Sequence, residues 1–133
     1  MLPYEFAAEA PDVPGIVYIV DDDCDVRDSL KWLLEANDYR VEDYESGETF
    51  IAQFNENVPS VILCDLRMPG MDGLEALKRM RALEGCPPVV IMTAYSTTET
   101  AIEATRLGAF DYMLKPFDIP QVLELLQRAL AAG

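Results

Sequence analysis

Short apolar runs alternate with longer amphipathic stretches over most of this chain. The short runs have the composition and periodicity of β-strands, and they occupy residues 16–20, 39–44, 61–64, 89–92 and 110–114. Three of them, 16–20, 61–64 and 89–92, are apolar at every position, which is typical of strands covered on both faces in a parallel sheet. Run 39–44 alternates apolar and polar residues and predicts an edge strand.

The longer stretches place apolar residues three or four positions apart, which is the spacing of one face of an α-helix. The first helix is predicted from Asp25 to about Asn37, and the second has Ser46 as its N-cap. The fourth is predicted to open on a capping box at residues 96–99 and to end at Gly108. The third and fifth helices are predicted at residues 74–80 and 118–129.

This alternation of strand and helix predicts an α/β protein. Because crossovers between parallel strands are right-handed, we expect a doubly wound, five-stranded parallel sheet with helices on both faces. A chain of 133 residues suits one domain and is too short for two. Residues 1–15 are rich in proline and lack periodicity, so they are predicted to be a leader or linker before a domain that spans residues 16–133.

Composition narrows the classes of partner and cofactor. Ten Lys and Arg residues against 24 Asp and Glu residues give a net charge of −14, which argues against direct nucleic acid binding and against association with anionic membranes. The chain has no histidine, which excludes an imidazole base and phosphohistidine and argues against zinc. Three widely spaced cysteines and the lack of a long apolar segment predict a cytoplasmic protein.

Polar functional groups stand where four of the five predicted strands end. Asp21 and Asp22 follow the first, Asp65 the third, Thr93 the fourth and Lys115 the fifth. Each residue alone also fits a simpler role in a turn, a cap or a rim. Parallel strands, however, share one carboxyl edge, so these side chains are expected to meet at a single mouth where ligands bind in such sheets.

The residues at this mouth match the needs of phosphoryl transfer. Three clustered carboxylates repel one another, and Mg²⁺ is the hard divalent cation that fits them best, usually with one or two carboxylates and phosphate oxygens as ligands. The Asp65 carboxylate can attack phosphorus, while Lys115, the Thr93 hydroxyl and the backbone N–H of Ala94 can neutralise the phosphoryl oxygens.

These motifs together resemble a known family. Asp21-Asp22, Asp65 with Met-Pro-Gly-Met-Asp-Gly near it, Thr93-Ala94, Tyr112 and Lys115-Pro116-Phe117 resemble the receiver domain of bacterial two-component response regulators. The resemblance runs from about residue 16 to residue 130. It implies a flavodoxin-like fold with strand order 2-1-3-4-5.

The resemblance also implies a role for each site residue. Asp65 is the implied phosphoacceptor, Asp22 the main metal ligand, Asp21 a ligand acting partly through water, and the backbone carbonyl of Arg67 a third protein ligand. The Lys115–Pro116 peptide bond is expected to be cis. Phosphorylation is expected to draw Thr93 toward the phosphoryl group, with the Tyr112 ring filling the space that Thr93 leaves.

The implied partners follow from this switch. A cognate histidine kinase is expected to donate the phosphoryl group, and the face formed by the fourth helix, fifth strand and fifth helix is expected to control an output or to form a homodimer. A covalently linked output domain, absent from this chain, and control of transcription are further expectations. The protein is expected not to be an enzyme beyond self-catalysed phosphorylation and dephosphorylation.

Two other interpretations stay open at this stage. A phosphatase of the haloacid dehalogenase type also uses an aspartate nucleophile with Mg²⁺, but it needs a second aspartate two residues later, where this chain has Arg67. A pseudo-receiver would keep the fold as a binding module that is never phosphorylated. Its mark is loss of an acid, the threonine or the lysine, and this sequence keeps them all.

Overall fold

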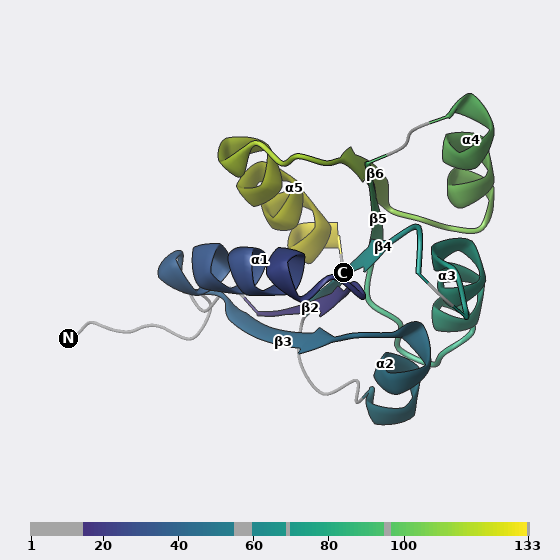
Figure 1. Ribbon diagram of the computed structural model, residues 1–133, viewed down its shortest axis with the longest axis horizontal. Helices are drawn as coiled ribbons and strands as arrows, with labels where there is room; N and C mark the ends of the chain where they lie inside the picture. Colours follow the sequence, from purple (N-terminus) through teal and green to yellow (C-terminus); the bar gives the residue numbers. More distant parts are fainter. Residues whose placement is uncertain (1–14, 55–59, 69, 95–96, 133) are drawn as a thin grey trace.

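The structure is a computed structural model that describes residues 15–54, 60–68, 70–94 and 97–132 (Figure 1). Strands and helices alternate along the chain as the sequence pattern predicts. The strands are β2 (Ile16–Val20), β3 (Arg40–Tyr44), β4 (Ser60–Asp65), β5 (Val89–Thr93) and β6 (Asp111–Leu114). The helices are α1 (Cys24–Ala36), α2 (Gly47–Gln53), α3 (Gly73–Arg81), α4 (Thr98–Arg106) and α5 (Ile119–Ala132).

The five strands form one parallel sheet in the order β3-β2-β4-β5-β6. In chain order this is 2-1-3-4-5, which confirms the predicted doubly wound fold and places β3 at an edge. The register pairs Val20 with Cys64, Asp65 with Met92, and Thr93 with Leu114. The strands therefore end close together at one edge of the sheet.

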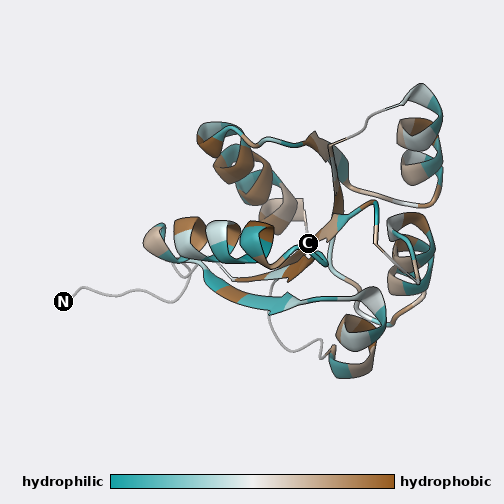
Figure 2. Ribbon diagram, viewed as in Figure 1, coloured by the Kyte–Doolittle hydropathy of each residue, from teal (hydrophilic) through white to brown (hydrophobic). Residues whose placement is uncertain are grey.

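A hydrophobic core fills the space on each face of the sheet. Successive strand residues point to opposite faces, so Val17 and Ile19 enter the core beneath α1 and α5, while Tyr18 and Val20 enter the core beneath α2, α3 and α4. Figures 1 and 2 show this division, with apolar helix faces turned toward the sheet. The double burial explains why the central strands are continuously apolar.

Helix caps fix the ends of the helices, and they correct two predicted boundaries. The Ser46 hydroxyl accepts the N–H of Thr49 at 3.1 Å, so the predicted cap of α2 is confirmed. Helix α1 begins at Cys24, slightly earlier than predicted, because the Asp23 carboxylate caps it through the N–H of Asp25. The predicted capping box of α4 was wrong in its members, since Thr97 and Thr100 bond reciprocally to each other's N–H.

Some predicted features fall outside the part of the chain that the structure describes. Residues 1–14, which make up nearly all of the predicted leader, and Ser96 of the predicted capping box belong to this group. Gly108 has a φ of +100° and follows α4, which confirms it as the residue that ends this helix. None of the helices within the described residues has the length and apolar character needed to cross a membrane.

Candidate functional site

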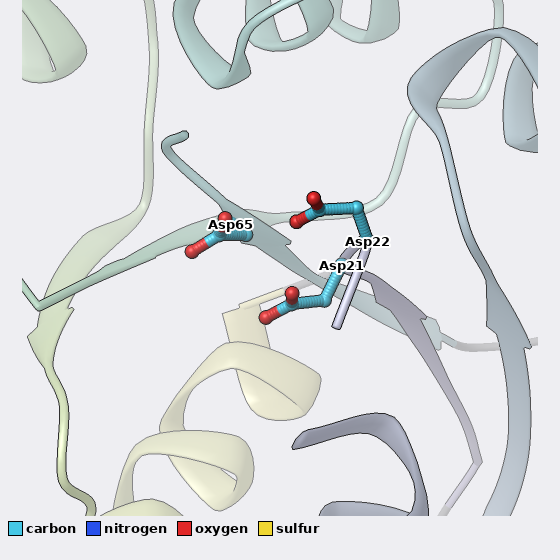
Figure 3. A group of neighbouring side chains, drawn as sticks. All are labelled: Asp21, Asp22 and Asp65. Atoms are coloured by element: carbon cyan, nitrogen blue, oxygen red, sulfur yellow. The ribbon is translucent and has the colours of Figure 1, made fainter. Parts of the chain in front are cut away.

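A cluster of three carboxylates lies at the carboxyl edge of the sheet. Asp21 and Asp22 directly follow β2, and Asp65 is the last residue of β4. Figure 3 shows the three side chains pointing into one common space, and one oxygen from each lies within 4.8 Å of the others. Asp21 and Asp65 are buried, whereas Asp22 is exposed. The predicted convergence of these three acids is therefore present in the fold.

Lys115, which directly follows the edge strand β6, contacts two of these acids. Its ammonium nitrogen lies 2.8 Å from Oδ2 of Asp21 and 2.9 Å from Oδ1 of Asp65, with only 18% of the side chain exposed. The backbone N–H of Lys115 donates to the carbonyl of Thr93, which ties the end of β6 to β5. The Lys115–Pro116 peptide bond is cis, as the family resemblance implied.

The electrostatics of the cluster oppose ionisation of Asp65. Burial raises the pKa of this carboxyl, the bond from Lys115 lowers it, and the nearby Asp21 and Asp22 charges raise it, with a net upward direction. Burial lowers the pKa of Lys115, but its bonds to Asp21 and Asp65 outweigh burial and raise it overall. The cationic form of Lys115 is thus stabilised, whereas the charged form of Asp65 is disfavoured.

The loop between β2 and α1 is held by several hydrogen bonds to Asp21. Oδ1 of Asp21 accepts the N–H of Asp23 at 2.9 Å, while Oδ2 takes the Lys115 ammonium. The backbone N–H of Asp21 donates to the carbonyl of Tyr44, and its carbonyl accepts from Arg27 at 2.6 Å. Both carboxylate oxygens of Asp21 are already engaged within the protein, which suits a ligand acting through water better than a direct one.

Arg27 is a residue at this site that sequence reasoning missed. It lies in the first turn of α1, where a cation is unfavourable next to the positive end of the helix dipole. Its guanidinium also reaches Asp43 on the neighbouring strand β3, at 3.1 Å. The misplaced charge in the sequence was the signal that could have singled it out.

Thr93 and Tyr112 lie on adjacent strands, Thr93 at the carboxyl end of β5 and Tyr112 as the second residue of β6. Thr93 is buried as the last residue of β5, and Ala94 follows it on the exposed side. Tyr112 is half-buried on β6, and its hydroxyl lies 3.0 Å from Oγ1 of Thr100 on α4. Ala94 and Lys115 line a cavity of about 510 Å³, together with residues of α1.

The start of α3 packs very closely on the end of β4, where Asp65 lies. Arg67 lies in the loop between them, two residues after Asp65, and its side chain is exposed. Gly73 packs so tightly on the loop that a Cβ atom would lie 2.5 Å from the Cα of Leu66 and closer still to the carbonyl oxygen of Asp65. Its N–H also donates to the carbonyl of Leu66 at 2.8 Å. Only glycine fits this contact, so Gly73 fixes the backbone of Asp65.

The donor atoms of the cluster fit a hard divalent cation. All three candidate ligands are carboxylates, and oxygen donors of this kind suit Mg²⁺, Mn²⁺ or Ca²⁺. One lysine cannot neutralise three acids, so a cation placed among them would reduce their mutual repulsion. Burial, with the neighbouring carboxylates, raises the pKa of the Cys64 thiol, so this cysteine does not supply a thiolate ligand at neutral pH.

Comparisons with known proteins agree with this geometry. The family model for the response regulator receiver domain matches residues 17–127. The chain is 45% identical over 114 residues to the regulatory protein AtoC of Escherichia coli, and 42% identical over 117 residues to the DNA-binding transcriptional regulator NtrC of Salmonella typhimurium. These alignments cover 86% and 88% of the chain but only 25% of each relative, so the chain spans about a quarter of their length.

A solved structure supports the same assignment. The crystal structure of FixJ-N superposes with a TM-score of 0.80 at 35% identity, and the match covers 87% of this chain and 93% of that one. The shared strand order, the acid cluster and the family match rest on separate observations and agree with one another. The chain therefore belongs to the response regulator receiver domain family.

Proposed function

We propose that this domain accepts a phosphoryl group on Asp65 and relays it as a signal. The observation that carries the proposal is the contact of the Lys115 ammonium with Oδ1 of Asp65 at 2.9 Å, beside the carboxylates of Asp21 and Asp22. A buried acid at the mouth of a parallel sheet, next to a fixed cation, is placed for nucleophilic attack on phosphorus. The phosphoacceptor domain comprises residues 16–133, with residues 1–15 as a leader or linker.

The reaction requires little proton transfer from the protein. A carboxylate oxygen of Asp65 forms a bond to phosphorus as the donor's bond to phosphorus breaks, and the donor leaves with that electron pair. For a histidine kinase the broken bond is P–N, and for acetyl phosphate it is P–O. The cation of Lys115, the Thr93 hydroxyl and the N–H of Ala94 compensate the charge on the phosphoryl oxygens.

Mg²⁺ is the cofactor in this proposal. When bound, it offsets the negative charge of the acid cluster and of the incoming phosphoryl group. Asp22 and Asp65 are its direct side-chain ligands, Asp21 contributes partly through water, and the Arg67 backbone carbonyl completes the protein ligands. The exposure of Asp22 and the two occupied oxygens of Asp21 support this division of roles.

The switch acts through Thr93 and Tyr112. Phosphorylation of Asp65 attracts the Thr93 hydroxyl, and the Tyr112 ring moves inward beside it. This movement breaks the hydroxyl contact between Tyr112 and Thr100 and so changes how α4 packs on β6. The elements α4, β6 and α5 each carry an exposed apolar residue, Ile102, Leu114 and Ile119, which supports docking of a partner or of a second copy on them.

A cognate histidine kinase supplies the phosphoryl group in this proposal, and the output is control of transcription through a linked output domain. The printed name of NtrC as a DNA-binding transcriptional regulator supports this output. Because this chain has a net charge of −14 and would be repelled by DNA, we assign any DNA contact to the output domain and not to this domain. We place the reaction in the cytoplasm, and we assign the domain no activity toward other substrates beyond self-catalysed phosphorylation and dephosphorylation.

Intact mass spectrometry after incubation with acetyl phosphate and Mg²⁺ tests the proposal. We expect the mass of one phosphoryl group to be added, and we expect none in Asp65→Asn or in the presence of EDTA. Asp28→Asn, which changes an exposed acid on α1 outside the cluster, serves as a control and should still be phosphorylated. An adduct that persists in Asp65→Asn would place the acceptor elsewhere, and no adduct in a protein that binds Mg²⁺ would favour a pseudo-receiver.

A further inference from the structure

Arg27 links two elements that flank the acid cluster. Nη1 of its guanidinium donates to the backbone carbonyl of Asp21 at 2.6 Å, and Nε donates to Oδ2 of Asp43 at 3.1 Å. Only 17% of the Arg27 side chain and 26% of the Asp43 side chain are exposed, so solvent screens this pair less than a surface pair. One rigid side chain therefore connects α1, the loop after β2 and the edge strand β3.

The carbonyl that Arg27 holds belongs to the peptide group joining Asp21 to Asp22. This peptide group is planar, so fixing the direction of its oxygen also fixes the direction of the bond that leads to the Cα of Asp22. On the preceding side, the N–H of Asp21 is held by the carbonyl of Tyr44 at 3.1 Å. Asp22 itself is exposed, so the direction of its carboxylate depends on the backbone that carries it.

We infer that Arg27 is a positioning residue for cation binding, which aims the Asp22 carboxylate into the cluster by holding the Asp21–Asp22 peptide group against β3. The inference rests on the proposed function, because it assigns Arg27 a role at that same site. Arg27 contacts neither the phosphoryl group nor the metal in this account. Its role is exerted through the backbone, with Asp43 as the anchor of its guanidinium.

Electrostatics alone predicts the opposite effect of removing Arg27. Arg27 is a cation beside a cluster of acids in a chain with a net charge of −14, so its loss should make the site more negative and strengthen cation binding. Loss of positioning should weaken binding instead. The direction of the change therefore distinguishes a positioning residue from a mere charge.

The chain offers a matched control in Lys31. Lys31 lies on α1, as Arg27 does, and its ammonium is 3.8 Å from Oδ1 of the same Asp43. The Lys31 side chain is 42% exposed. Lys31→Met removes one positive charge from the same acid while leaving the bond from Arg27 to the Asp21 carbonyl. Arg27→Met removes the same charge together with that bond.

The experiment measures Mn²⁺ binding by electron paramagnetic resonance and Mg²⁺ binding by competition, using the full 133-residue chain. We expect Arg27→Met to lower the affinity for both ions about tenfold, as is usual when a residue that supports metal ligands is lost. The affinity of Lys31→Met for both ions should stay within about twofold of the wild-type affinity or be higher. Arg27→Lys, which keeps the charge on a single nitrogen, should recover only part of the affinity.

The second readout compares two kinetic quantities of phosphorylation, the Mg²⁺ concentration that gives half-maximal rate and the rate at saturating Mg²⁺. With acetyl phosphate as donor, Arg27→Met should need about tenfold more Mg²⁺ for half-maximal rate and reach a similar rate at saturation. Affinity in Arg27→Met that equals or exceeds that of Lys31→Met would overturn the inference. If Arg27→Met does not fold, the affinity of Asp43→Asn for Mn²⁺ is measured instead, with Glu42→Gln on the same strand as its charge control. Equal affinity in these two variants would also overturn the inference.

These results also separate the inference from the proposed function. The wild type should bind Mn²⁺, and Asp22→Ala should not. Wild-type protein that fails to bind would overturn both. Normal binding and phosphorylation in the wild type, together with unchanged affinity in Arg27→Met, would overturn only the role of Arg27.

Discussion

At the scale of single residues, the site combines groups that are individually unfavourable. Asp65 is buried among like charges, and Arg27 lies at the wrong end of a helix. Neither placement contributes to a stable fold by itself. The burial of Asp65 has a physical reason if the site receives a cation, because the cation would complete the charge balance of the acids. The charge of Arg27 is balanced by Asp43, and its guanidinium holds the Asp21 carbonyl. Local cost at functional positions is a general feature of protein sites.

The charge on Asp65 should make stability depend on pH. Its pKa is raised from the ordinary value of 3.8, so between that value and the raised one the folded chain keeps a proton that the unfolded chain has lost. The free energy of unfolding therefore falls as the pH rises through this window. We expect Asp65→Asn, without Mg²⁺, to raise the melting temperature at pH 7 by roughly 2–5 °C.

Thermal unfolding followed by circular dichroism measures this effect. The gain in Asp65→Asn should shrink as the pH is lowered through this window, because below 3.8 the wild-type carboxyl becomes protonated in the unfolded chain as well as in the folded one. Asp28→Asn, at an exposed position on α1, removes the same charge outside the cluster and should change the melting temperature little. A lower melting temperature for Asp65→Asn at pH 7 would show that its bond to Lys115 outweighs burial and repulsion.

Gly73 gives a second test at this scale. Gly73→Ala would force a methyl group against the backbone of Asp65 and Leu66, and we expect the free energy of unfolding to fall by about 1–3 kcal/mol. Urea unfolding measures this loss. Gly47→Ala is the comparison, because its Cβ would meet side-chain atoms at 3.0 Å (Cβ of Ala76) and 3.2 Å (Sδ of Met71), farther away than the backbone atoms that a Cβ at Gly73 would meet. A smaller loss at Gly73 than at Gly47 would contradict the tight contact.

At the scale of elements, α4 is connected to the sheet in an unusual way. The capping box of Thr97 and Thr100 fixes the first turn of α4, and Thr100 also contacts the Tyr112 hydroxyl on β6. The cap of the helix and the hydroxyl of Tyr112 therefore share one side chain. A movement of Tyr112 would reach the first turn of α4 directly through Thr100.

Removing this shared contact should loosen α4 selectively. We expect Tyr112→Phe to lower the free energy of unfolding by about 0.5–1.5 kcal/mol, the usual contribution of one hydrogen bond. Amide hydrogen exchange should become faster in α4 than in α5. Thr105→Ala is the control, because it loses a hydroxyl bond within α4 and leaves the contact with Tyr112 in place. Unchanged exchange in α4 of Tyr112→Phe would show that this hydroxyl does not hold the helix.

At the scale of the whole molecule, the acid cluster couples ligand binding to stability. Its members come from two strands that are central in the sheet, so a cation bound there would connect β2 to β4 in addition to their backbone pairing. The overall charge of −14 attracts any divalent cation weakly, whereas the cluster would bind one at a defined place. Thermal stability in the presence of Mg²⁺ can distinguish these two effects.

We expect Mg²⁺ to stabilise the wild type by about 2.7 kcal/mol when present at about 100 times its dissociation constant. Differential scanning calorimetry measures this shift, with NaCl at matched ionic strength to remove the general effect of charge screening. Asp22→Ala should lose most of the shift. A shift of equal size in Asp22→Ala would exclude this residue as a ligand.

Much of the fold could be predicted because its signals are local. Continuous apolar runs marked the central strands, alternation marked the edge strand β3, and helical spacing marked the helices, since burial on one or both faces acts on neighbouring positions. The starts of α1 and α4 differ from the predicted ones, because Asp23, Thr97 and their neighbours can all act as caps. The sequence also predicted that Asp21, Asp22, Asp65 and Lys115 would meet, because parallel strands share one edge.

The sequence by itself therefore determined the elements, their order and the functional groups that meet at the carboxyl edge of the sheet. Only the tertiary structure decided the connections between residues that are distant in sequence, such as Arg27 with Asp43, Tyr112 with Thr100, and Gly73 with Asp65. The physical reason is that periodicity specifies which face a residue occupies, whereas a contact across elements depends on strand register, helix position and side-chain length. These three quantities are fixed only when the whole core is packed.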